Sequence, residues 1–172
     1  GSLRKLIDID AIINVAESPK VNELIVIGDG PQRESLETKK QNRSIDSLRI
    51  TGSLPDKEAY SLVSSSQVAI NPQKPSKSQL ATSPVKLYYY AGLETAIVAS
   101  TGPSLVRNLT EFGGAVGIGE QVSTARQGVE LLLRNQQFCQ EVSSRAKEFA
   151  LNCTWDRRIS EHISELEEKN VL

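Results

Sequence analysis

A phosphate-binding site is predicted by the stretch Ser83-Pro84-Val85-Lys86. A serine followed by a proline is typical of the cap and first position of a helix. The free N–H groups at a helix start attract anions, and a lysine in the first turn adds a full positive charge. We therefore expect Ser83, Pro84 and Lys86 to hold the phosphates of an activated small molecule.

Two glycine-containing turns follow apolar runs of strand length, Gly28-Asp29-Gly30-Pro31 and Gly52-Ser53. The first resembles the opening of a dinucleotide-binding fingerprint, but Arg33 stands where the third glycine would be and Pro31 removes a backbone N–H. A nicotinamide or flavin site is therefore a poor fit. A purely structural tight turn remains an equal alternative for Gly28 and Gly30.

Residues for other chemistry are scarce. His162 is the single histidine and falls within a predicted helix, where a structural role is the default. Cys139 and Cys153 lack the spacing of metal ligands, which favours free thiols in a reducing compartment. No nucleophile and base are paired in the sequence, so we assign no catalytic residue and expect neither a metal nor another cofactor.

The elements that must position these residues follow from apolar periodicity. Helices are predicted for residues 4–18, 31–41, 55–64, 83–92, 102–109, 124–135, 137–152 and 155–169, and strands for 21–27, 48–51, 67–71, 95–99 and 114–118. In the helix at 83–92, Val85, Leu87, Tyr88 and Ala91 are expected to pack on the sheet, and at most two of the adjacent tyrosines at 88–90 can face a crevice.

Alternating strands and helices predict an α/β fold, a Rossmann-like three-layer domain with a mainly parallel sheet, over residues 1–172. Ligands of such sheets bind beyond the carboxyl ends of the strands, so the loops at 28–31, 52–54, 71–82 and 100–103 should share one rim. A parallel sheet usually has a strand before its first helix. We therefore expect an upstream strand, and interpret Gly1-Ser2, in a chain without methionine, as a cloning scar.

Composition excludes several classes of function. The 20 Lys and Arg residues face 21 Asp and Glu residues, so the chain has no basic surplus for bulk nucleic-acid binding. No apolar run approaches the roughly 18 residues that a membrane-spanning helix needs. We expect a cytoplasmic protein without a nucleic-acid partner.

The order of motifs resembles that of the C-terminal half of GT-B glycosyltransferases, specifically the retaining, group 1 enzymes of family-4 type. The residues that carry this likeness are spread along nearly the whole chain: Ile-Gly-Asp-Gly-Pro at 27–31, Ile-Thr-Gly at 50–52, the apolar run ending at Pro72, Ser-Pro-Val-Lys-Leu at 83–87, Ile-Val-Ala-Ser at 97–100, and Trp155.

The resemblance implies a domain that binds a UDP- or GDP-linked sugar, with Ser83, Pro84 and Lys86 near the diphosphate. It also implies that the turns at Gly28 and Gly30, and at 52–54, line the donor crevice, the latter near the base. The family's phosphate-binding basic loop matches Lys5. By the same likeness, a glycan or lipid-linked acceptor binds an N-terminal domain outside this chain, and the full-length protein makes cell-surface polysaccharide, with the inner face of the membrane as an alternative location.

The chain departs from the family at two positions where glutamates often stand, which here are Ala81 and Tyr89. A tyrosine hydroxyl still hydrogen-bonds a ribose, but without the charge of a carboxylate. Two alternatives therefore remain open, a degenerate domain that binds or scaffolds without catalysis, and a sugar-nucleotide epimerase. We expect this chain alone to be inactive as a transferase.

Overall fold

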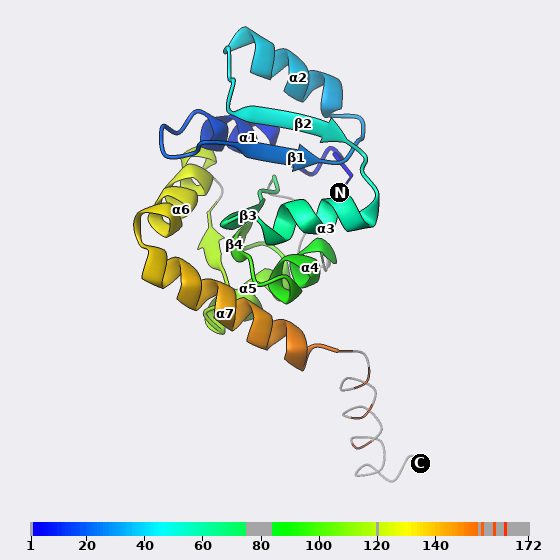
Figure 1. Ribbon diagram of the computed structural model, residues 1–172, viewed down its shortest axis with the longest axis vertical. Coiled ribbons are helices and arrows are strands. Elements are labelled where there is room, and N and C mark those ends of the chain that lie inside the picture. Colours follow the sequence, from blue (N-terminus) through cyan, green and yellow to red (C-terminus); the bar gives the residue numbers. More distant parts are fainter. Residues whose placement is uncertain are drawn as a thin grey trace.

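The computed structural model describes residues 2–74, 84–119 and 121–154, together with residues 156, 160 and 164. Strands and helices alternate and helices close the described part, which confirms the predicted α/β class (Figure 1). The helices are α1 (Ile9–Ala16), α2 (Arg33–Asn42), α3 (Asp56–Ser64), α4 (Lys86–Gly92), α5 (Ser104–Glu111), α6 (Val122–Arg134) and α7 (Gln136–Asn152). The strands are β1 (Leu24–Ile27), β2 (Leu48–Gly52), β3 (Val68–Asn71), β4 (Ala96–Ser100) and β5 (Val116–Ile118).

The described strands form two sheets rather than the single sheet that the sequence suggested. One sheet pairs β1 with β2, and the other has the order β3-β4-β5. Every pairing within them is parallel, as predicted. The division falls between β1 and β3, where no described strand provides the hydrogen bonds that would join the two sheets.

The core is organised around β4, all five residues of which are buried. Its side chains alternate between two layers, as a strand requires. Ala96 and Val98 pack with residues of α1 and α6, whereas Ile97 and Ala99 pack with residues of α4, α5 and α7. A third cluster joins α1 and α2 to β2. These clusters give the covered, three-layer arrangement that parallel strands need.

The first helix is shorter than predicted, because it begins at Ile9 rather than at residue 4. The Asp8 carboxylate accepts hydrogen bonds from the N–H groups of Asp10 and Ala11, both at 3.1 Å, and so caps α1. Leu6 therefore lies outside the helix. The preceding residues are tied down elsewhere: the Leu3 N–H donates to the carbonyl of Asp29 at 2.8 Å.

Other predicted boundaries differ from the structure by a few residues, but one packing prediction is wrong. Val85 is 61% exposed and does not join the apolar stripe of α4, whereas Leu87 and Ala91 are buried as expected. The helix predicted over 155–169, with Trp155 and His162, lies outside the described residues apart from isolated positions. Among the helices described, none has the length and apolar character needed to cross a bilayer.

Replacing Gly114 by alanine tests the close packing of α7 on this core. A Cβ atom at Gly114 would lie 2.8 Å from the Cα of Ala146 and 2.8 Å from a methyl of Leu109. We expect Gly114→Ala to lower the free energy of unfolding by about 1–3 kcal/mol, because α7 must shift. Urea unfolding followed by circular dichroism measures this difference.

Gly92→Ala is the matched control, because a Cβ atom at Gly92 meets nothing within 4 Å. It lies in α4, so alanine should leave stability unchanged or raise it by up to about 1 kcal/mol. Equal losses in the two variants would contradict the packing explanation.

Candidate functional site

A cavity of about 930 Å³ runs between β1 and β3 and extends to the carboxyl ends of the strands. Residues from four separate segments line it at this end, and we call them the rim: Gly28, Asp29, Ser53, Leu54, Tyr60, Lys86 and Tyr89. The loops after β1 and β2 therefore meet α3 and α4 where the sequence analysis expected a shared edge. This is also where parallel α/β sheets generally bind ligands.

Lys86 is the cation of this rim. Its side chain is partly buried and borders both the large cavity and a neighbouring one of about 80 Å³. Burial lowers the pKa of the Lys86 amine, and no described carboxylate forms an ion pair with it. A desolvated cation without a counter-charge is costly. The arrangement favours an anionic ligand, whose charge would replace the missing partner.

Two tyrosines from different helices meet beside Lys86. The rings of Tyr60 in α3 and Tyr89 in α4 have centroids 5.3 Å apart and planes inclined by 31°. Burial and a hydrogen bond with Tyr89 raise the pKa of the Tyr60 hydroxyl. These rings offer both an apolar surface and hydroxyl groups to a bound molecule.

The neighbouring tyrosines divide as helical geometry predicted. Tyr89 and Tyr90 line the cavity, whereas Tyr88 does not border it. Tyr88 and Tyr90 both pack against the core cluster under α4. Burial raises the pKa of Tyr90 to about 12, so its hydroxyl stays neutral at physiological pH. A neutral phenol can donate a hydrogen bond to an anion.

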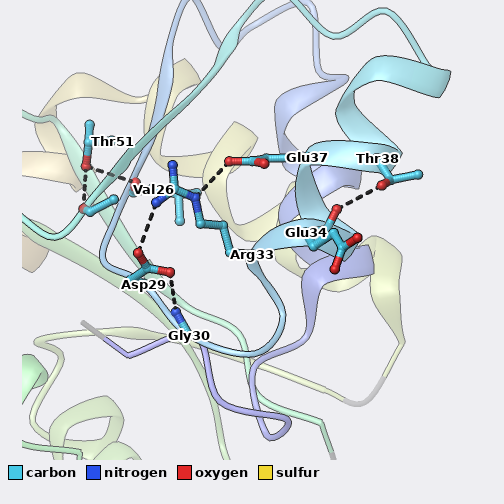
Figure 2. A network of polar contacts seen from close by, with 9 residues as sticks. Val26, Asp29, Gly30, Arg33, Glu34, Glu37, Thr38 and Thr51 are labelled. Carbon is cyan, nitrogen blue, oxygen red and sulfur yellow. Dashed lines mark hydrogen bonds and ion pairs between the residues drawn. The ribbon is translucent and has the colours of Figure 1, made fainter.

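The turn after β1 is fixed by a small network of charges (Figure 2). The Asp29 carboxylate accepts from the Gly30 N–H at 2.7 Å and from the Arg33 guanidinium at 3.0 Å, and both lower the pKa of Asp29. Arg33 also donates to Glu37 at 2.8 Å. The arginine at the expected third-glycine position therefore braces the turn, which agrees with the structural alternative for this motif.

At two of the predicted site glycines, close packing of the backbone explains why the residue is glycine. Gly30 has φ +149°, and a Cβ atom there would lie 2.9 Å from the backbone N of Leu3. Gly52 has φ +73°, and its Cβ atom would lie 2.9 Å from the Arg33 guanidinium. Gly28 lines the cavity, whereas Gly30 and Gly52 do not border it.

The remaining predicted site residues either do not border the cavity or lie outside the described residues. Lys5 is exposed in a turn and does not border the cavity. Pro84 is half-buried, and its carbonyl accepts from the Leu87 N–H at 2.9 Å, so a tight turn precedes α4. Ser83 and Ala81 lie outside the described residues, and ligand contacts at all these positions stay predictions.

Sequence reasoning missed Tyr60 and Arg33. The sequence patterns that could have identified these two residues differ in strength. Asp29, Arg33 and Glu37 are spaced four residues apart, which on a helix start predicts ion pairs. Tyr60 gave no such signal, because its partner Tyr89 comes from another helix.

Within the part of the chain that the structure describes, no three His, Cys, Asp or Glu side chains gather as metal ligands would. Cys139 and Cys153 are free thiols. Burial raises the pKa of Cys139, which disfavours the nucleophilic thiolate.

Comparison with known proteins identifies the fold. No protein family and no curated protein matches the sequence. Solved structures do match: the C-terminal domain of a group 1 glycosyl transferase from Francisella tularensis has a TM-score of 0.70 at 12% identity, covering 89% of this chain and 82% of that one. The fold is that of a GT-B C-terminal domain.

Two larger structures share this GT-B domain. TarM of S. aureus, solved in complex with UDP, matches with a TM-score of 0.77 at 14% identity over 96% of this chain. The pneumococcal O-GlcNAc transferase GtfA, in complex with UDP and GlcNAc, matches with a TM-score of 0.73 at 14% identity over 97% of it. This chain spans 34% of the length of each of them.

Replacing Lys86 by methionine should stabilise the unliganded domain at neutral pH. Because its folded-state pKa is lowered, the unfolded chain binds more protons between that value and the ordinary pKa of 10.5. Stability of the native sequence therefore rises with pH through this window. The advantage of Lys86→Met should be greatest at pH 7 and shrink towards pH 11, as measured by urea unfolding across this range.

Lys57→Met supplies the control, since Lys57 is exposed on α3 and does not border the cavity. It should show no such pH-dependent advantage. A destabilising effect of Lys86→Met at pH 7 would mean that the amine has a stabilising partner.

Proposed function

We propose that this GT-B domain is the donor-binding half of a retaining, group 1 glycosyltransferase of family-4 type. Its donor would be a UDP- or GDP-linked hexose, transferred to a glycan or lipid-linked acceptor in cell-surface polysaccharide synthesis. The observation that carries the proposal is Lys86, a partly buried cation without a described ion pair at the ligand-binding edge of the sheet. Similar structures solved with UDP support the same ligand class.

In this proposal the diphosphate binds beside Lys86 and the start of α4. The nucleoside extends towards Ser53, Leu54 and Tyr89, which occupy the same rim. Tyr89 would hydrogen-bond the ribose in place of a carboxylate. Ser83, Pro84 and Lys5 would add phosphate contacts, and Gly28 would allow close approach of the donor.

The chemical role of the domain is to stabilise the departing nucleoside diphosphate. Negative charge develops on the phosphate oxygens as the bond between the sugar and the diphosphate breaks. Preorganised cations and N–H donors stabilise such charge most strongly where water is excluded, and Lys86 is already desolvated. We expect this to proceed without a metal ion.

The acceptor site would lie on a separate N-terminal domain, as expected from the length of the similar enzymes. The 172-residue chain should therefore bind a nucleotide but transfer no sugar. In the cell the full-length protein would act in the cytoplasm, at or near the inner membrane face.

Nucleotide titration followed by NMR or calorimetry tests the site. We expect UDP or GDP to bind more tightly than ADP, with shifts confined to the rim and the start of α4. Lys86→Met should weaken diphosphate binding at least about tenfold, since a charge-assisted contact is worth roughly 1.5–3 kcal/mol. Uridine lacks phosphates, so Lys86→Met should bind it about as tightly as the native chain does.

Lys57→Met again serves as the matched control and should bind like the native chain. Equal loss in both variants would point to general charge effects. In the full-length protein, transfer that persists undiminished in Lys86→Met would contradict the donor role and favour a scaffolding domain.

A further inference from the structure

Lys86 lies in a different environment from the other lysines of the described ranges. It is the one among them that borders the small cavity of about 80 Å³, whose walls are largely apolar. Ile7, Ile12 and Ile70 belong to these walls. An ammonium group gains little solvation from such neighbours, so they favour the neutral amine over the charged form. Burial accordingly lowers the pKa of Lys86.

Two other lysines show the opposite arrangement, in which a carboxylate holds the charged form. Lys39 donates to Asp10 at 2.8 Å, and Lys147 donates to Glu94 at 2.6 Å. A protonated amine of this kind has no free electron pair on its nitrogen and is not a nucleophile. Lys86 forms no ion pair with any described carboxylate, so nothing of this kind retains its proton.

The carboxylates at the same end of the large cavity do not supply the missing partner. Asp29 is held by Arg33 at 3.0 Å, and Asp56 is exposed at the start of α3. The neighbouring phenol is no counter-charge either, because burial raises the pKa of Tyr90 to about 12 and keeps it neutral. The surroundings of Lys86 thus combine apolar walls with neutral or already paired groups.

A small molecule has room to approach this amine. Lys86 is only partly buried, and besides the small cavity it lines the larger one of about 930 Å³. Its position is fixed by the next residue, Leu87, which is 1% exposed and packs in the core under α4. A desolvated lysine that a small molecule can reach is the arrangement that makes a lysine amine nucleophilic in covalent catalysis.

We propose that Lys86 is a site of covalent acylation, which takes the acyl group of a small activated donor whose leaving group is a phosphate or a thiol. The neutral amine attacks the acyl carbon and a C–N bond forms. The bond from that carbon to the leaving oxygen or sulfur breaks and its electron pair leaves with that atom. The amine gives up one proton, which the leaving phosphate or thiolate takes up through water. The product is an uncharged amide.

The consequence of this modification rests on the proposed function, whereas the reactivity of Lys86 does not. Acylation removes the cation of the rim, so the modified domain should lose its charge-assisted contact with a diphosphate. A bound diphosphate should in turn hold the proton on the amine and protect Lys86 from the acyl donor. Acylation therefore inactivates empty domains and spares those that hold a nucleotide.

The test incubates the folded domain with acetyl phosphate in one arm and with S-acetyl-N-acetylcysteamine, a thioester, in the other. Peptide mass spectrometry follows the acetylation of each lysine with time. We expect Lys86 to react at least about fivefold faster than Lys57, which is exposed on α3 and borders neither cavity, in one arm or both. The arm that reacts identifies the leaving group. In urea the two lysines should react at similar rates, because the difference between them comes from the fold.

Acetylation of Lys86 no faster than that of Lys57 in both arms would overturn the proposal, whatever the domain binds. The Lys86→Arg variant keeps a positive charge but offers no amine. Pretreatment with the reactive donor should weaken UDP binding by the native chain at least about tenfold and leave Lys86→Arg at its own untreated affinity. An equal loss in both chains would exclude Lys86 as the residue responsible. Fast acetylation of Lys86 that UDP does not slow would support this inference and contradict the proposed donor site.

Discussion

Burial of β4 on both faces is the constraint from which the rest of this structure follows. Four consecutive residues, Ala96 to Ala99, are 0% exposed, so each face of the strand must be covered completely. Alanine alternates with larger residues on both faces, which lets α6 approach on one side and α4 and α7 on the other. Gly114, in contact with Ala146, repeats this use of small residues where α7 crosses. The position of α4, and hence of Lys86, is a consequence of this packing.

The carboxyl end of the sheet carries polar groups that the core does not satisfy. Asn71, at the end of β3, is 1% exposed, and neither its side-chain oxygen nor its nitrogen has a hydrogen-bond partner. Lys86 is also partly buried, without an ion pair from any described carboxylate. Each buried, unpaired polar group typically costs about 1–3 kcal/mol. Unpaired polar groups at the ligand-binding end of a parallel sheet are expected at functional sites, where a bound molecule supplies the missing partners.

Local patterns in the sequence were sufficient to predict the order of the elements and the strand β4. A continuous apolar run of strand length between two helices has few other interpretations. These patterns also limited to two the number of tyrosines of α4 that could face the cavity, without identifying which. The exposure of Val85 was not predictable, because the start of α4 depends on how the preceding residues turn. The division of the sheet was equally hidden, because the residues of a strand do not say which other strand it pairs with. The pairing of Tyr60 with Tyr89 likewise joins distant segments.

The charges at the rim further constrain how the proposed donor would lie. Asp29 borders the cavity and its pKa is lowered, so it is a carboxylate at neutral pH. Arg33 offsets that charge but is shared with Glu37, which leaves the turn after β1 with one net negative charge. A diphosphate placed there would meet repulsion in addition to desolvation, whereas beside Lys86 it would relieve an existing cost. The phosphates should therefore lie on the α4 side of the rim and the neutral hydroxyl groups of the ligand on the Asp29 side, where a carboxylate is a good acceptor for them.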